Sequence, residues 1–225
     1  MADTLPFVVA FDLVSGIIAL LVSYYAFQAR RWIESSVLSA ISFGFMLLGA
    51  ALLVEAVTTL SLGFTAAQAS RLMAFELLEN LAYLILQVVA LGVIAVGYAR
   101  ATYGGGVKAT AQSSIVYVVN AVARPARLVG LALLLYYLFL GLEFVILIVL
   151  VFIIFQGFLI YTKNRDDSSL LVLLGFALIF VAHLVVLGSI LDFSGNQYLV
   201  AAAVQFLGFL SLLTFAIRSG RIGST

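Results

Sequence analysis

The sequence predicts an all-α integral membrane protein, a polytopic bundle of six or seven transmembrane helices. Of its 225 residues, 65% are hydrophobic and only 9% are charged, whereas soluble domains carry about 25% charged residues. Apolar runs long enough to cross a bilayer, which takes about 20 residues, recur along the chain. Because hydrocarbon offers the backbone no hydrogen-bond partner, we expect every span to be a helix, with no β-sheet and no extramembrane domain.

Composition also excludes several classes of function. The net charge of +1 gives no basic surface for nucleic acid. The absence of cysteine excludes disulfides and thiolate metal sites, and the single histidine, His183, cannot supply the paired ligands of a haem. No motif of a known catalytic site is present. We therefore expect no enzyme activity, no cofactor and no metal site.

Three apolar runs precede a glycine-rich break at Tyr103-Gly-Gly-Gly106. The first ends at the basic and aromatic residues Arg30-Arg31-Trp32, which are typical of a membrane interface. An uncharged loop is expected over Thr58 to Ser70. The three predicted spans are Leu5 to Phe27, Val37 to Val57 and the helix that opens at Arg71 and continues to Tyr98.

The second half of the chain is harder to divide. Lys108 to Arg127 is either an interfacial segment or a short fourth crossing. Leu128 to Tyr161 is an apolar run of 34 residues, about 51 Å as one helix, against a hydrocarbon core of about 30 Å. It is expected to tilt, to leave the bilayer, or to turn near Gly141. The last two predicted spans are Leu170 to Leu191 and Tyr198 to Ile217.

The two halves resemble each other weakly, which suggests an internal repeat of three-helix units. Gln87 precedes Arg100 by 13 residues, and Gln205 precedes Arg218 by the same number. This pattern predicts a unit over residues 1–103, a linker over 104–127 and a second unit over 128–225, a plan found in transporters. A chance match between leucine-rich helices is the alternative interpretation.

The number of crossings determines how the halves are oriented. If the chain crosses the membrane twice between Lys108 and Tyr161, there are seven spans and the two halves are parallel. If it crosses only once there, there are six spans and the two halves are antiparallel. With the N-terminus outside, seven spans place eight basic residues inside and three outside. Six spans would place six basic residues inside and five outside. The positive-inside rule therefore favours seven.

A polar stripe marks the third predicted span as central to the bundle. Glu76, Glu79, Asn80, Tyr83 and Gln87 recur at helical spacing among leucine, alanine and valine. Such a stripe must face protein or water, because lipid gives it no partner. Its expected neighbours, which with the stripe form a candidate site for binding a proton or cation, are Asp12, Glu55, Glu143 and His183.

Each candidate also has a structural interpretation. Polar pairs between membrane helices stabilise packing by about 0.6 kcal/mol on average. Asp12, Glu55 and Glu143 can also lie near enough to the interface to reach water, and His183 is typical of a packed, hydrogen-bonded histidine. The polar groups would then hold helices together and bind nothing.

Three hypotheses for function follow. The first is a small proton- or cation-coupled carrier or channel in the cell membrane that uses buried carboxylates. The second is a non-catalytic membrane subunit that holds a larger complex together, and the third is the membrane module of a sensor. The expected partners are the lipid bilayer and either further copies of the chain or other membrane subunits.

The first prediction concerns the stripe. If Glu79 binds a transported proton or cation, Glu79→Gln should keep the fold and abolish flux in liposomes, because it preserves shape and removes the charge. If the stripe only stabilises packing, Glu79→Gln should be nearly neutral, while Glu79→Leu should lower thermal stability in detergent through lost hydrogen bonds.

Overall fold

The computed structural model describes residues 5–30, 36–64, 69–103, 128–192 and 197–222, without the side chains of 61–80, 128–135 and a few helix ends. This part of the chain is helical apart from one short turn, and each helix contains a stretch long and apolar enough to span a membrane. The prediction of a polytopic helical membrane protein is therefore confirmed. The helices are α1 (Leu5–Arg30), α2 (Ser36–Phe64), α3 (Ala69–Tyr103), α4 (Leu128–Asn164), α5 (Asp167–Asp192) and α6 (Gln197–Ile222).

Two boundaries differ from the sequence-based expectation. Helix α2 continues through Thr58 to Phe64, so the loop expected over 58–70 was placed too early. The Thr58 hydroxyl donates to the backbone carbonyls of Val54 and Glu55. Its hydrogen bond is therefore made within the helix, to the preceding turn. The run from Leu128 is one continuous helix of 37 residues that does not turn at Gly141, where a Cβ would meet nothing. Its length is about 55 Å.

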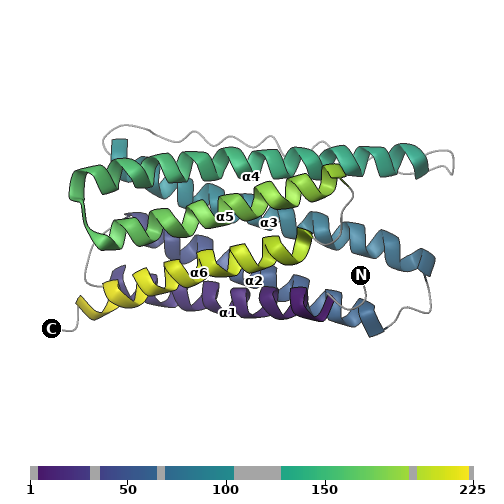
Figure 1. Ribbon diagram of the computed structural model, residues 1–225, viewed down its shortest axis with the longest axis horizontal. Coiled ribbons are helices and arrows are strands. Elements are labelled where there is room, and N and C mark those ends of the chain that lie inside the picture. The colour runs from purple at the N-terminus through teal and green to yellow at the C-terminus, as the bar shows by residue number, and fades with distance from the viewer. Residues whose placement is uncertain (1–4, 31–35, 65–68, 104–127, 193–196, 223–225) are drawn as a thin grey trace.

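The helices form a closed ring in which each contacts the helix before and after it, and α6 contacts α1. Figure 1 shows α1, α3, α4 and α6 running in one direction, with α2 and α5 antiparallel to them. The rings of Phe11 in α1 and Phe206 in α6, each in the first half of its helix, lie 5.6 Å apart, as parallel neighbours require.

Helix α3 therefore ends, and α4 begins, at opposite ends of the bundle. The directions of α1, α2 and α3 are therefore repeated by α4, α5 and α6 in the same order. This is the parallel arrangement that we expect if the chain crosses the membrane once more between Tyr103 and Leu128. That expected crossing lies outside the described residues. The repeat itself, with Gln87 over Gln205, stays a prediction.

Glycines allow the closest helix pairs to approach. In α1 and α2, a Cβ at Gly49 would lie 2.9 Å from the Gly16 carbonyl oxygen. In α5 and α6, a Cβ at Gly208 would lie 2.9 Å from the Gly175 carbonyl oxygen. Small residues at helix crossings are typical of membrane bundles, because association there depends on close van der Waals contact.

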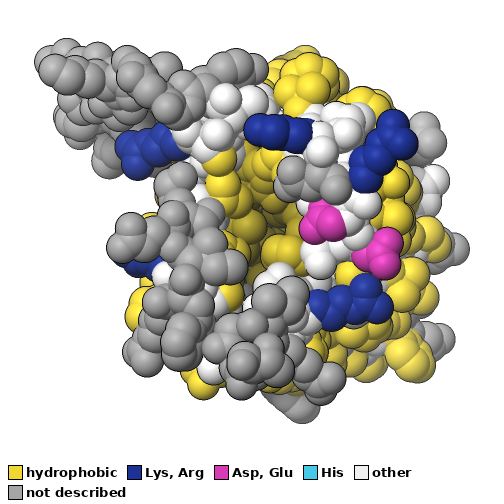
Figure 2. All heavy atoms as spheres, turned by 90° about the vertical axis from the view of Figure 1, so that its left-hand side faces the viewer, with side chains coloured by type: hydrophobic (Ala, Val, Ile, Leu, Met, Phe, Trp, Pro, Cys, Tyr) yellow, Lys and Arg dark blue, Asp and Glu magenta, His cyan; other side chains and the backbone are white. Residues whose placement is uncertain are grey.

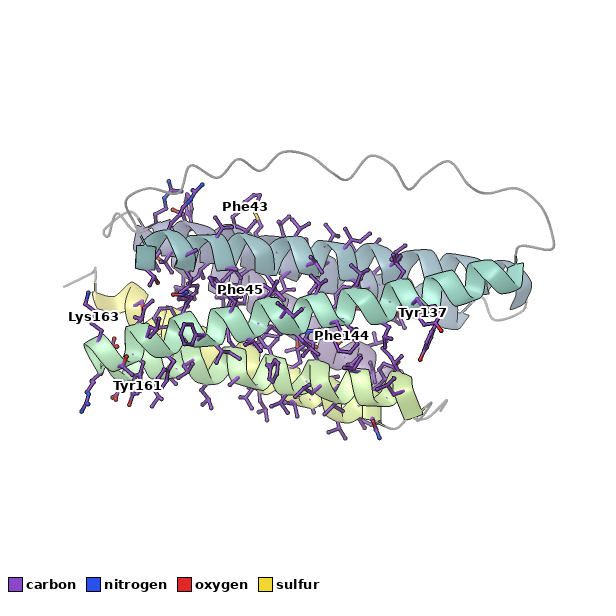
Figure 3. The ribbon with its side chains drawn as sticks, turned by 90° about the horizontal axis from the view of Figure 1, so that it is seen from above. Phe43, Phe45, Tyr137, Phe144, Tyr161 and Lys163 are labelled. Carbon is purple, nitrogen blue, oxygen red and sulfur yellow. The ribbon has the colours of Figure 1, made fainter. Side chains whose placement is uncertain are left out.

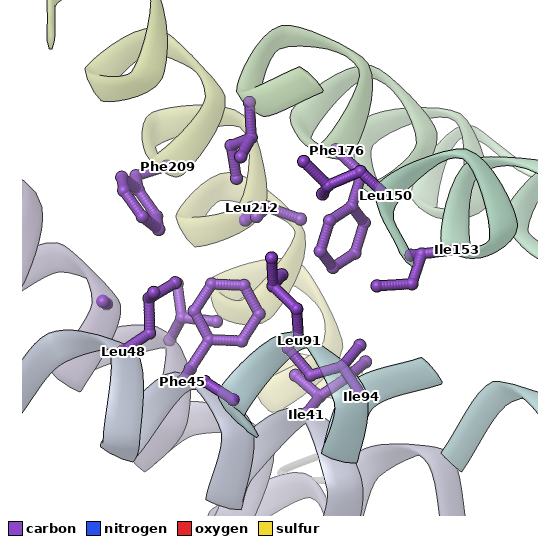
Figure 4. Packing of buried hydrophobic residues seen from close by; sticks show 14 of the residues in the cluster. Ile41, Phe45, Leu48, Leu91, Ile94, Leu150, Ile153, Phe176, Phe209 and Leu212 are labelled. Atoms are coloured by element: carbon purple, nitrogen blue, oxygen red, sulfur yellow. The ribbon is translucent and has the colours of Figure 1, made fainter. Parts of the chain in front are cut away.

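Large side chains fill the centre of the ring. Phe45 of α2 is fully buried, and its ring lies 6.2 Å from that of Phe176 in α5 and 6.2 Å from that of Phe209 in α6. Tyr98 of α3 completes this aromatic cluster, with its ring 6.4 Å from Phe176. Figure 4 shows these phenylalanines together with leucines and isoleucines from the surrounding helices. Thus helices that are not neighbours in the ring are joined by aromatic contacts.

The described basic side chains gather at one end of the bundle. Every basic side chain that the structure describes lies at the end where α1, α3, α4 and α6 finish, which we call the basic end: Arg30, Arg100, Lys163, Arg165 and Arg218. Figure 2 shows Lys and Arg side chains around the rim of this end, with acidic side chains among them and hydrophobic side chains visible at the centre. By the positive-inside rule we expect this end to face the cytoplasm.

The glycine crossings give a stability prediction. Gly49→Ala and Gly208→Ala should each lower the free energy of unfolding by about 1–3 kcal/mol, because the new methyl group overlaps the backbone of the neighbouring helix. Gly141→Ala is the matched control, since its methyl group meets no atom. Thermal unfolding in detergent measures the difference, and equal effects at all three positions would contradict the close crossings.

Candidate functional site

Three buried polar side chains from three helices meet inside the bundle. His183 Nδ1 in α5 lies 2.9 Å from Glu143 Oε2 in α4, and His183 Nε2 lies 2.6 Å from Gln87 Nε2 in α3. The exposed fractions of Glu143, His183 and Gln87 are only 3%, 4% and 1%. We call these residues the polar triad. It joins α3, α4 and α5 away from both lipid and water.

The local sequence explains why these side chains point inward. Glu143 and His183 stand alone among leucine, isoleucine, valine and phenylalanine over most of their spans. A charged or strongly polar group at mid-bilayer costs about 2.5–3.5 kcal/mol on insertion scales, so each helix is stabilised with its polar residue turned toward protein. The neighbouring positions Phe144 and Leu184 are exposed, as expected where the same helices turn toward lipid.

The two contacts restrict where the histidine proton lies. With the Gln87 amide nitrogen donating to Nε2, the imidazole is neutral and its Nδ1–H donates to the Glu143 carboxylate. The Gln87 Oε1 then has no hydrogen-bond partner. Rotating the amide by half a turn would present this oxygen to Nε2 instead, and Nε2 could then carry a proton. The triad therefore has two hydrogen-bonded arrangements that differ by one proton.

A second polar contact lies beside the triad. The partly buried Tyr83 of α3 is hydrogen-bonded to the side chain of Gln205 in α6, and the Gln205 Nε2 has no partner. Asp12 of α1, Glu55 of α2 and Glu143 are close enough to the Tyr83 hydroxyl to act on it electrostatically. The stripe residue Tyr83 is thus within electrostatic reach of Glu143 of the triad and of the carboxylates on α1 and α2.

Each of the six described helices contributes at least one residue to this polar layer, which consists of Asp12, Glu55, Tyr83, Gln87, Glu143, His183 and Gln205. The residues of α1, α4 and α6 lie in the first halves of their helices, and those of α2 and α5 lie in the second halves. Given the helix directions, the layer is displaced toward the end opposite the basic end. The aromatic cluster of Phe45, Phe176, Phe209 and Tyr98 is displaced toward the basic end.

The sequence-predicted site is only partly brought together by the described residues. Tyr83 and Gln87 do turn to the bundle interior, and Glu143 and His183 pair with each other and with Gln87. Asp12 and Glu55 lie around Tyr83. Glu76, Glu79 and Asn80 are on α3, but their side chains lie outside the described residues. Their contact with another buried polar group stays a prediction.

Sequence reasoning did not include Gln205 in the site. The signal for it was present, because Gln205 stands at the same distance from Arg218 as Gln87 does from Arg100. Among the described residues, no group of three or more histidine, aspartate or glutamate side chains is arranged to hold a metal ion. The layer presents carboxyl, imidazole, amide and hydroxyl groups, all of which form hydrogen bonds.

Comparisons of the chain with protein-family models, with curated proteins and with solved structures find no match.

The triad gives a second stability prediction. Glu143→Leu should lower the free energy of unfolding by about 3 kcal/mol, because it leaves a buried imidazole without its partner. The double variant Glu143→Leu, His183→Leu should lose less than the sum of the two single variants, since both ends of the contact are removed together. Thermal unfolding in detergent measures all three, and strict additivity would show that the two residues are not coupled.

Proposed function

We propose that this multi-pass membrane protein is a small carrier or channel in which the Glu143–His183 pair binds a proton during transport. The observation that carries the proposal is the buried contact between the carboxylate and the imidazole, 2.9 Å long, with an amide on the second imidazole nitrogen. Ionisable groups inside membrane spans are typical of proton and ion pathways, because burying them without a function is costly.

Proton binding at this pair follows from the hydrogen bonds. In the first arrangement, a neutral His183 donates from Nδ1 to an anionic Glu143, and the triad carries one negative charge. A proton that adds to Nε2 makes the imidazolium, which pairs with the carboxylate, and the triad becomes neutral. The Gln87 amide turns its free Oε1 toward the new N–H. Binding thus requires one side chain to rotate and no helix to move.

The rest of the polar layer supports a route to the pair. Tyr83 and Gln205 provide hydroxyl and amide groups beside it, and Asp12 and Glu55 add carboxylates that attract cations. On the other side of the layer, the aromatic cluster around Phe45 separates the triad from the basic end. Polar groups on one side of the triad would let a proton approach it, and the apolar side chains on the other side would hinder uncontrolled leakage toward the basic end.

The function of a non-catalytic subunit has one specific observation in its favour. Helix α4 turns a row of large exposed apolar side chains outward, which includes Phe144, Ile148, Phe155 and Phe158. Such a row suits lipid and also suits another membrane helix. If the chain depends on a partner for stability in detergent and gives no proton flux when it is alone, this function replaces the carrier.

The test is proton movement in proteoliposomes that enclose a pH-sensitive dye. A potassium diffusion potential drives a conducting pathway, and a sodium gradient drives an exchanger, so the two arms cover both modes. We expect the wild-type protein to change the internal pH in at least one arm. Glu143→Gln should abolish this signal, because the amide keeps the shape of the side chain but cannot hold the negative charge that pairs with the imidazolium.

Asp167→Asn is the matched control. It also exchanges a carboxylate for an amide, but at an exposed position near the basic end, away from the polar layer. It should retain full flux. A wild-type signal no faster than that of empty liposomes in both arms, or full flux with a correctly folded Glu143→Gln protein, would contradict the proposal.

A further inference from the structure

A groove of about 570 Å³ runs along the outer surface between α2 and α3, away from the polar layer. We propose that this groove binds an anionic phospholipid, with an acyl chain against its apolar walls and the phosphate at Arg100. This inference does not depend on the transport function. It rests on the shape of the groove, its direction, and the single charge at its mouth.

Small residues make the groove. Ser39 and Ala40 line it from α2, and Gly92 and Gly97 line it from α3. A Cβ at Gly92 would have no atom within 4 Å, so this part of α3 is not pressed against its neighbour. By contrast, a Cβ at Gly44 would lie 2.8 Å from the Ala90 carbonyl oxygen, where the same two helices do touch. The groove is thus a local separation beside a tight crossing.

The groove opens toward lipid and not toward the bundle interior. Phe43 on its wall is 50% exposed, whereas Phe45, two residues later, is buried in the aromatic cluster. Figure 3 shows Phe43 on the outer side of α2 and Phe45 on the inner side. Val89 and Val96 on the α3 wall are also exposed. In a membrane these walls are therefore available to an acyl chain.

One charge lies at the mouth of the groove. Arg100 is the only charged side chain among the lining residues, and it is exposed and makes no ion pair with any described residue. It lies at the basic end, where lipid headgroups are expected, while Val89 lies about 16 Å deeper along α3. A basic residue above an apolar groove between membrane helices complements an anionic lipid headgroup.

Other occupants fit this combination less well. A free phosphate ion would match Arg100 but leave the apolar walls uncovered. A zwitterionic lipid would match the walls, but its positive headgroup would offset its attraction to the guanidinium. A second protein segment, from residues 104–127 or from another copy of the chain, is distinguished by the experiment below.

The experiment uses tryptophan quenching by brominated lipids. Trp32 is the only natural tryptophan, so Trp32→Phe with Phe43→Trp places one fluorophore on the groove wall. The protein is reconstituted in phosphatidylcholine with either brominated phosphatidylglycerol or brominated phosphatidylcholine at the same fraction. We expect the anionic lipid to associate about fivefold more strongly, because one basic residue near an anionic lipid contributes about 1 kcal/mol.

Two variants and one matched position make the result specific. Adding Arg100→Gln should remove the preference for the anionic lipid, and adding Gly92→Leu should fill the groove and weaken quenching by both lipids. With Trp32→Phe, Phe158→Trp on the outer side of α4 is the control, since it lies outside the groove near the basic residue Lys163. It should show a smaller preference that Arg100→Gln does not change.

Two results would overturn the proposal. Equal quenching of the tryptophan at position 43 by both lipids would show that the groove does not select a negative headgroup. Quenching there much weaker than at position 158 by either lipid would show that protein covers the groove, either residues 104–127 or a second copy.

Discussion

The need to satisfy polar groups inside hydrocarbon governs this structure. A carboxylate, an imidazole and an amide lie inside the membrane-spanning helices, and lipid can solvate none of them. They meet as Glu143, His183 and Gln87, so that α3, α4 and α5 are held in one relative rotation. Once these helices are oriented, their remaining residues turn either to the centre of the ring or to lipid.

Close packing and serine hydrogen bonds then complete the ring. The Ser23 hydroxyl of α1 donates to the Ser42 carbonyl of α2, and the Ser42 hydroxyl donates to the Ser23 carbonyl. The Ser211 hydroxyl of α6 donates to the Leu171 carbonyl of α5. The crossings of α1 with α2 and of α5 with α6 depend on paired glycines, which bring two backbones into contact. The aromatic cluster links helices that are not neighbours, since Phe45 reaches both Phe176 and Phe209. The bundle is thus joined by a polar layer toward one end and by an aromatic cluster toward the other.

The polar layer differs from the aromatic cluster in how completely its buried groups are hydrogen-bonded. Packing needs the buried hydrogen bonds to be complete, yet the amide oxygen of Gln87 and the amide nitrogen of Gln205 have no partners. Leaving a buried polar group without a hydrogen-bond partner is costly. The aromatic cluster, in contrast, carries no polar group except the Tyr98 hydroxyl.

Local physics was enough to predict the helices and their faces. Because hydrocarbon offers the backbone no hydrogen-bond partner, each apolar span is expected to form a helix. Helical spacing then places Tyr83 and Gln87 on the same inward side of α3. Spacing along one helix says nothing of which helices become neighbours, so the contact between Glu143 and His183, 40 residues apart, required the tertiary structure. The parallel directions of α3 and α4 follow from the seven-span arrangement that the distribution of basic residues favoured, and the tertiary structure shows them. The sequence by itself therefore determined a helical membrane bundle and the inward side of α3 at Tyr83 and Gln87, and the packing of helices decided which of the described polar groups come together.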